Sequence, residues 1–219
     1  MATMGRSRKI PAFIVCGLIC GCQTTNTARR DATEQPDSST FVHSFTKFSF
    51  PESIGTFHRV EVRKYDRDGR DVGVGYNSPT PIAATVFIYP GPKDFALLPA
   101  PKLENVSEAL LDQHFQVCKQ DILRNHSDGK MIAESPCQIV QGKNRIEGKR
   151  ASFSLSYKFG SLPQESVSEL YVFLIDPSVK FLVTDREFVK YRFTYPILEK
   201  AHAESEVAAF LSDLAWPTK

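Results

Sequence analysis

The stretch ASFSLSYKF at residues 151–159 decides the fold class of this chain of 219 residues. Apolar side chains occupy the odd positions of this stretch, and serine or lysine occupies the even ones. Because successive side chains of a strand point to opposite faces, the alternation predicts a strand with one buried face. The stretch LYVFLI at 170–175 follows and is apolar at every position, which predicts a central strand covered on both faces.

Further strands are expected on either side of this pair. Upstream, Val60 and Val62 are predicted to share one face of a strand whose other, solvated face carries Arg59. A similar alternation recurs at 72–76, and the fully apolar run at 84–89 predicts a second doubly covered strand. Three more strands are expected: one between the first helix and this pair, with Cys137 in it, and two after the pair at 180–184 and 188–195, joined as a hairpin across Asp185-Arg186.

Two amphipathic helices accompany the strands. Asn105 and Glu108 have the spacing of an N-cap and its reciprocal acid, which predicts a helix start there. Apolar residues then follow at helical spacing, and a similar stripe recurs near the C-terminus. These stripes consist of Leu111, Phe115, Cys118 and Ile122 in the first helix and Ala203, Val207, Phe210 and Leu214 in the second.

This order predicts an α+β domain at 41–219, with a mostly antiparallel β-sheet and helices packed on both of its faces. The closing segments ELYVFLI and EVAAFLSDL make the order similar to the Mog1/PsbP-like sandwich, whose DcrB-like members include envelope lipoproteins. The resemblance implies that fold and the cell envelope. It concerns topology and matches no family motif residue by residue, so it assigns no functional residue. A different α+β sandwich remains an alternative.

The N-terminus has the features of a secretory signal. A basic stretch is followed by an apolar run from Ile10 to Gly21, which is shorter than the ~20 residues of a membrane-spanning helix. Ile19-Cys20-Gly21-Cys22 resembles the bacterial lipobox, in which Cys22 carries the lipid and the signal peptide comprises residues 1–21. The residue after Cys22 is Gln23 and not Asp, which in an enterobacterial-type sorting system resembles the pattern for an outer-membrane destination. A plain signal cleaved near Gly21 and an uncleaved anchor are the alternatives.

Residues 22–40 contain no large apolar side chain after Cys22 and are expected to be a flexible tether. Without residues 1–21 the chain has 24 basic and 25 acidic side chains, because the signal contains Arg6, Arg8 and Lys9. This balance argues against nucleic acid as a partner. The membrane, through the lipid anchor, and an envelope protein docking on a sheet edge or loops are the expected partners.

Cys118 and Cys137 remain in the mature chain, and an even number of cysteines in an oxidising compartment favours a disulfide. Cys118 shares the apolar helix face, and Cys137 has the strand parity of Ile139 and Ala133. We therefore expect the two thiols to meet between helix and sheet. Two buried free thiols are the alternative.

The remaining polar motifs carry little chemistry. Asp66, Asp68 and Asp71 flank Gly69, but the glycine stands at position four rather than six of a calcium loop, so a hairpin turn is the favoured interpretation. His114 and Cys118 have the spacing of a nucleophile pair on a helix, although a core-edge histidine beside a cystine is the simpler interpretation. We expect no metal and no cofactor.

The sequence therefore predicts a lipid-anchored protein on the periplasmic face of the bacterial envelope that acts as a non-catalytic binding or assembly module. A periplasmic hydrolase is the alternative, since its site could form only in three dimensions.

Overall fold

The computed structural model describes residues 33–34, 39–91, 106–175 and 186–217. Two helices lie within these ranges, α1 (Val106–Asn125) and α2 (Lys200–Asp213), and a 3-10 turn, η4 (Ile197–Glu199), precedes α2. The strands are β1 (Thr33–Glu34), β2 (Phe41–Val42), β3 (Ser49–Phe50), β4 (Ser53–Ile54), β5 (Phe57–Lys64), β6 (Val72–Asn77), β7 (Ala83–Pro90), β8 (Lys130–Gln141), β9 (Asn144–Phe159), β10 (Leu162–Ile175) and β11 (Glu187–Pro196).

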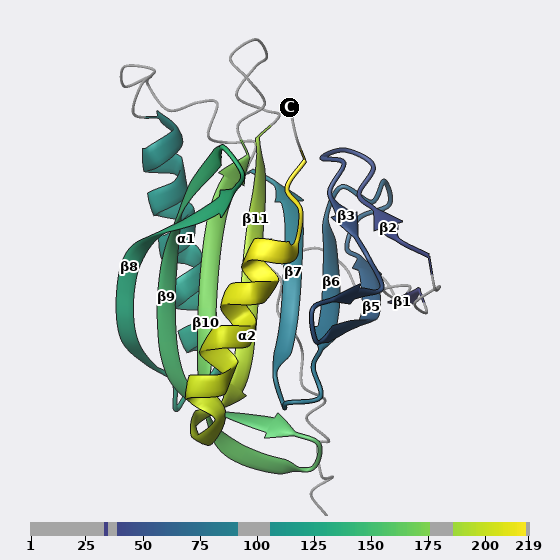
Figure 1. The fold of residues 1–219 in the computed structure, drawn as a ribbon. Coiled ribbons are helices and arrows are strands. Elements are labelled where there is room, and N and C mark those ends of the chain that lie inside the picture. The colour runs from purple at the N-terminus through teal and green to yellow at the C-terminus, as the bar shows by residue number, and fades with distance from the viewer. Residues whose placement is uncertain (1–32, 35–38, 92–105, 176–185, 218–219) are drawn as a thin grey trace, which may run out of the picture.

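One large antiparallel sheet organises the molecule (Figure 1). Its strand order is β1-β5-β6-β7-β11-β10-β9-β8, with β4 paired to β5, while β2 and β3 form a small sheet of their own. The prediction of an α+β domain with a mostly antiparallel sheet is confirmed. The predicted central strands at 84–89 and 170–175 are indeed interior strands, β7 and β10.

Each helix packs against its own set of sheet residues. Leu170 and Val172 of β10 belong to a buried cluster with α1, whereas Tyr171 and Phe173 belong to the cluster that contains the apolar stripe of α2. The α1 stripe predicted from the sequence is buried in the first cluster, and the α2 stripe is buried in the second. The helical periodicity therefore identified the packed faces correctly.

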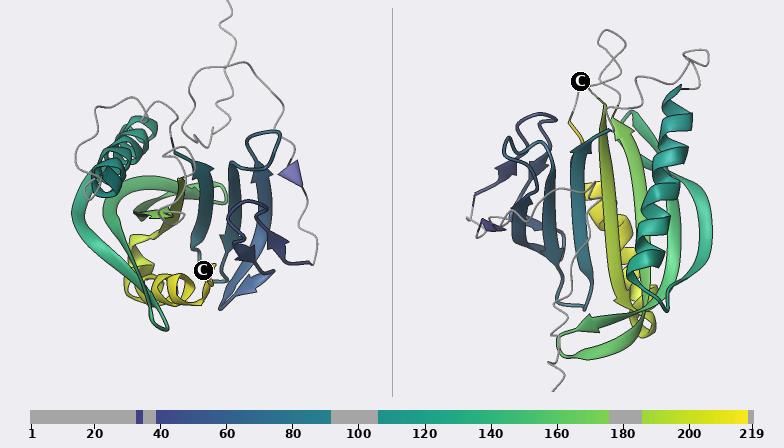
Figure 2. Two further views of the ribbon diagram at one scale, coloured as in Figure 1. Left: turned by 90° about the horizontal axis from the view of Figure 1, so that it is seen from above. Right: turned by 180° about the vertical axis from the view of Figure 1, so that it is seen from behind.

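The end of the sheet is curved, and this curvature shapes the candidate site. In Figure 2 (left), β8 and β9 bend from α1 toward α2. The side-chain amide of Gln141, at the end of β8, donates to the carbonyl of Leu214 at 2.8 Å, and its oxygen accepts from the backbone N–H of Trp216 at 2.9 Å. The segment after α2 is thereby joined to the outermost strand.

A β-bulge overturns the predicted faces of β5. The register shifts between Arg59 and Glu61, so the strict alternation assumed from the sequence does not hold there. Val60 is 42% exposed and Arg59 only 6%. The Arg59 guanidinium donates to the carbonyls of Phe50 at 2.6 Å and Ser39 at 2.5 Å. The expectation that Arg59 lies on a solvated face was therefore wrong.

The strands after α1 are longer than predicted. β9 and β10 form a long hairpin that turns at Gly160, whose φ of +69° favours glycine. The predicted strand at 180–184 lies outside the described residues, and β11 pairs with β10 and β7. Upstream, β1 pairs with β5, so part of the predicted tether contacts the domain.

Candidate functional site

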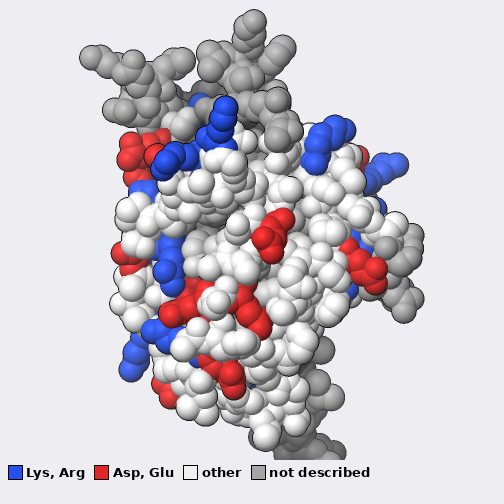
Figure 3. All heavy atoms as spheres, in the orientation of Figure 1, with Lys and Arg blue, Asp and Glu red and all other residues white. Residues whose placement is uncertain are grey.

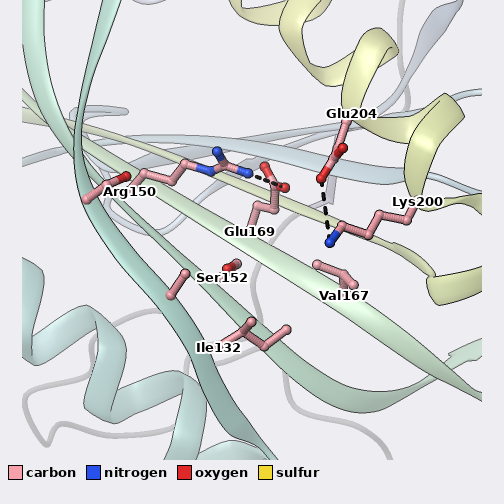
Figure 4. Close-up of a pocket in the computed structure, with 9 residues that line it drawn as sticks. Ile132, Arg150, Ser152, Val167, Glu169, Lys200 and Glu204 are labelled. Carbon is pink, nitrogen blue, oxygen red and sulfur yellow. Dashed lines mark hydrogen bonds and ion pairs between the residues drawn. The ribbon is translucent and has the colours of Figure 1, made fainter.

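A polar cavity lies between the curved strands β8–β10 and the first turns of α2 (Figure 4). Its volume is about 200 Å³. Sheet register places its strand residues in adjacent rows, since Ser135 lies opposite Arg150, and Ser152 lies opposite both Ala133 and Glu169. The lining residues are Ile132, Ala133, Ser135, Arg150, Ser152, Val167, Glu169, Lys200 and Glu204.

A buried carboxylate forms the inner wall of this cavity. The Glu169 side chain is buried, and Arg150 donates from Nη2 to its Oε1 at 2.8 Å. Two tyrosine hydroxyls also donate to the Glu169 carboxylate. Tyr195 donates to Oε1 at 2.7 Å, and Tyr171 donates to Oε2 at 2.5 Å. Burying a charge is costly unless it is paired and hydrogen-bonded, and Glu169 meets both conditions.

The two tyrosines are fixed as donors by their surroundings. Burial raises the pKa of Tyr171 and of Tyr195 above the usual value, and the adjacent charge of Glu169 raises both further. Their hydroxyls therefore stay protonated and hold the carboxylate from two sides. The Arg150 guanidinium also lies over the ring of Tyr171, 5.5 Å from its centroid. Its orientation is thus determined by a hydrogen bond and a cation–π contact.

The outer part of the cavity comes from α2. Lys200 and Glu204, one helical turn apart, form an ion pair of 3.9 Å at its mouth, as Figure 4 shows. Both side chains are about half exposed. A surface pair of this kind is weak, so these two side chains can rearrange around a ligand at little cost.

The lining residues combine charged, hydroxyl and apolar side chains. The nine residues described around the cavity include neither histidine nor cysteine, so its two serines have no imidazole base beside them there. Figure 3 shows acidic and basic side chains interspersed on the face seen there, without a large area of one sign. The arrangement provides a positioned guanidinium, hydroxyls and an apolar wall, which are the elements of a small-ligand site.

Sequence reasoning missed this site. Arg150 and Glu169 come from different strands and meet only through the β9–β10 register. One signal was available: Glu169 has the strand parity of Tyr171 and Phe173, directly beside the fully apolar run. A charged residue at a buried position next to a central strand indicates a partnered polar group.

The two predicted disulfide residues are not joined in this structure. Neither the Cys118 nor the Cys137 sulfur takes part in a disulfide bond. Cys118 lies in the α1 cluster, while Cys137 packs against the α2 cluster. The parity shared by Cys137 and Ile139 was right, but that parity faces α2 instead of α1. Burial raises the pKa of the Cys137 thiol to about 12, so it is protonated at neutral pH. The structure does not support the predicted bridge.

His114 and Cys118 do come together. The Cys118 sulfur lies 3.4 Å from Nε2 of His114, which is also hydrogen-bonded to the Tyr89 hydroxyl at 2.6 Å. The imidazole stacks on Phe188 at 4.0 Å. Cys118 is 2% exposed and His114 8%, so a substrate has no access to this thiol in the conformation described. These contacts fit the simpler interpretation for the histidine, which lies in the core, but its neighbour is a thiol and not the expected cystine.

The acidic segment at 66–71 is the predicted hairpin turn, between β5 and β6. The backbone N–H of Arg70 donates to Asp66 Oδ1 at 2.9 Å, and Gly69 has a φ of +68°. Within the described ranges no cluster of three or more His, Cys, Asp or Glu side chains is placed to hold a metal ion.

Cys22 lies outside the described residues, so its predicted lipidation stays a prediction. Neither helix of the described part combines the length and the hydropathy needed to cross a membrane. The chain matches no protein-family model, and no curated protein has significant sequence similarity to it.

Proposed function

We propose that this protein is a lipid-anchored, non-catalytic binding module of the bacterial cell envelope, held by Cys22 on the periplasmic face of the outer membrane. The lipobox-like Ile19-Cys20-Gly21-Cys22, the residue Gln23 and the polar segment after it support the anchor. The cavity between β8–β10 and α2 supports the binding role.

One observation carries the binding role. The side chain of Arg150 is 37% exposed at the cavity, while the carboxylate that holds it, Glu169, is 2% exposed. A ligand therefore meets a positioned guanidinium, while its counter-ion lies behind it and already accepts three hydrogen bonds. Preorganised donors of this kind lower the entropic cost of binding.

We also propose that α1 and α2 cover opposite faces of the sheet, as in a Mog1/PsbP-like sandwich. The alternation of Leu170 and Val172 with Tyr171 and Phe173 between the two clusters supports this arrangement. An envelope protein partner docks in this proposal along β8, where Met131, Ile132 and Val140 are about half exposed.

The binding role is tested by native mass spectrometry of the protein purified from its own membrane. The wild type should retain a small molecule that is released intact on unfolding. Ser152→Leu fills the cavity without removing Arg150 or Glu169 and should abolish retention. Ser156→Leu, four residues further along β9 at an exposed position, is the matched control and should retain the molecule. Equal retention by both variants would exclude the cavity as the site.

The anchor is tested separately. Mass spectrometry of the membrane-extracted chain should show an acylated N-terminal peptide that begins at Cys22. Cys22→Ser should abolish the modification and leave the domain folded. A wild-type chain recovered in soluble form with an unmodified N-terminus would contradict the anchor.

A further inference from the structure

The cavity has two chemically different walls, and together they define a class of ligand. From this geometry we infer that the cavity binds a small organic carboxylate with a short aliphatic chain, its carboxylate on Arg150 and its chain against Ile132, Ala133 and Val167. This inference rests on the proposed binding function and specifies its ligand.

The sign of the ligand charge follows from which charged groups it can reach. Glu169 is 2% exposed and its oxygens accept three hydrogen bonds, so it presents almost no surface to a ligand. Lys200 and Glu204 are paired with each other at the mouth. Arg150 is the accessible charge in the interior of the cavity, so the site favours an anion.

The form of the anion follows from the guanidinium. Nη2 of Arg150 donates to Glu169, and within the described part of the chain this is the guanidinium's one hydrogen bond. Its remaining N–H groups form a planar fork, which matches the two oxygens of a carboxylate. Ser135 and Ser152, in adjacent rows of the sheet, bring further hydroxyls to the same wall.

The size of the ligand follows from the cavity. About 200 Å³ is below the roughly 300–1,000 Å³ of pockets that hold drug-sized molecules. The apolar wall comes from Ile132 and Ala133 on β8 and Val167 on β10. Burying a few methylene groups there adds affinity in proportion to the apolar area covered. A short-chain fatty acid fits both the volume and the wall.

The test is an NMR titration of residues 22–219 carrying Cys22→Ser, a chain that contains all of the described structure. Butyrate is the probe, butyramide its neutral isostere, and inorganic phosphate an oxyanion without an aliphatic chain. Butyrate should cause saturable shifts of the Arg150 side-chain N–H and the Ser152 amide. Butyramide should bind about tenfold more weakly or worse, because it loses a hydrogen bond between charged groups. Phosphate should also be weaker, since it leaves the apolar wall uncovered.

Substitutions test whether butyrate binds at Arg150 and inside the cavity. Arg150→Lys keeps a charge beside Glu169 but removes the planar fork, and should weaken butyrate about tenfold. Arg145→Lys, the same change at an exposed position of β9, should leave the affinity unchanged. Ser152→Leu should abolish the shifts and Ser156→Leu should preserve them. Equal affinity for butyrate and butyramide, or for butyrate and phosphate, or shifts that survive Ser152→Leu, would overturn the inference.

The outcome is distinguishable from failure of the proposed function. If butyrate does not bind, but the membrane-purified protein retains another small molecule that Ser152→Leu loses, the ligand class is wrong and the binding function stands. If the protein neither binds butyrate nor retains a small molecule, both the ligand class and the proposed binding function are wrong.

Discussion

Arg150 and Glu169 are joined by a hydrogen bond of 2.8 Å, yet the exposed fraction of their side chains differs greatly, at 37% and 2%. Removal of one partner therefore leaves a different group behind in each case. Without Arg150, a fully buried carboxylate loses its counter-ion. Without Glu169, the Arg150 guanidinium loses its counter-ion, but it already reaches solvent.

We predict that Arg150→Met costs more stability than Glu169→Gln. The first change should lower the free energy of unfolding by about 3–5 kcal/mol, the cost of an uncompensated buried charge. The second should cost about 1–3 kcal/mol, because the neutral amide needs no counter-ion and its oxygen still accepts from one of the two tyrosines, which donate to different oxygens of Glu169. Urea unfolding curves give both values. A larger loss in Glu169→Gln would contradict the description of this pair.

Asp71, at the end of the β5–β6 turn, should make stability depend on pH. Burial raises the pKa of its carboxyl to about 6, and the charges of Asp66 and Glu187 add to the rise while Lys190 opposes it. Between about pH 4 and pH 6 the folded protein holds a proton that the unfolded chain has released. The free energy of unfolding should therefore decrease as the pH rises through this window.

Asp71→Asn should remove that decrease and make the protein more stable than the wild type above about pH 7, with little difference near pH 4. Asp68→Asn, an exposed position of the same turn, is the control and should keep the wild-type dependence. Urea unfolding at several pH values checks both variants. A destabilised Asp71→Asn protein above pH 7 would show that the charged carboxylate is needed.

Gly148 of β9 should not tolerate a side chain. A Cβ there would lie 2.7 Å from the carbonyl oxygen of Val172 and would overlap the ring of Phe173. Gly148→Ala should lower the free energy of unfolding by about 1–3 kcal/mol or more, as overpacking does. Gly91→Ala, whose nearest neighbours would lie at 3.4 Å, is the control and should be nearly neutral. Similar melting temperatures for the two variants would contradict the packing described at Gly148.

Cys118 and Cys137 should be recovered as separate thiols. The two residues pack in different clusters, and the raised pKa of Cys137 keeps its thiol protonated. After unfolding without reductant, alkylation and peptide mapping should label both cysteines. A peptide pair linked through Cys118 and Cys137 would show that the arrangement of the clusters described here is wrong.

Local periodicity predicted much of the fold. The stripe Phe115, Cys118 and Ile122 and the alternation at 151–159 each indicate burial within one element. The structure buries that stripe and the first three apolar residues of the alternation, and it leaves Tyr157 and Phe159 half-buried. The bulge in β5 was not predictable in this way. An extra residue in one strand changes which face the following side chains point to, and the residue types of the strand do not reveal it.

The candidate site was beyond local reasoning for a related reason. It depends on which residues lie opposite one another in β8, β9 and β10, and on where α2 begins relative to them. The sequence contains Arg150 and Glu169, but the register that pairs their strands comes from tertiary packing. Cys137 is a similar case. The sequence showed that it shares a strand face with Ile139, but it did not show which helix packs on that face.

The most direct test of the central claim uses the small molecule released from the membrane-purified protein. It should be returned at stoichiometric concentration to residues 22–219 carrying Cys22→Ser, and the NMR signals of the protein and of the molecule should be followed together. The molecule should cause shifts at Arg150, Ser152 and Val167 and should be recovered unchanged after prolonged incubation. Chemical conversion of the molecule by this protein, absent in Ser152→Leu and present in Ser156→Leu, would contradict it and identify an enzyme.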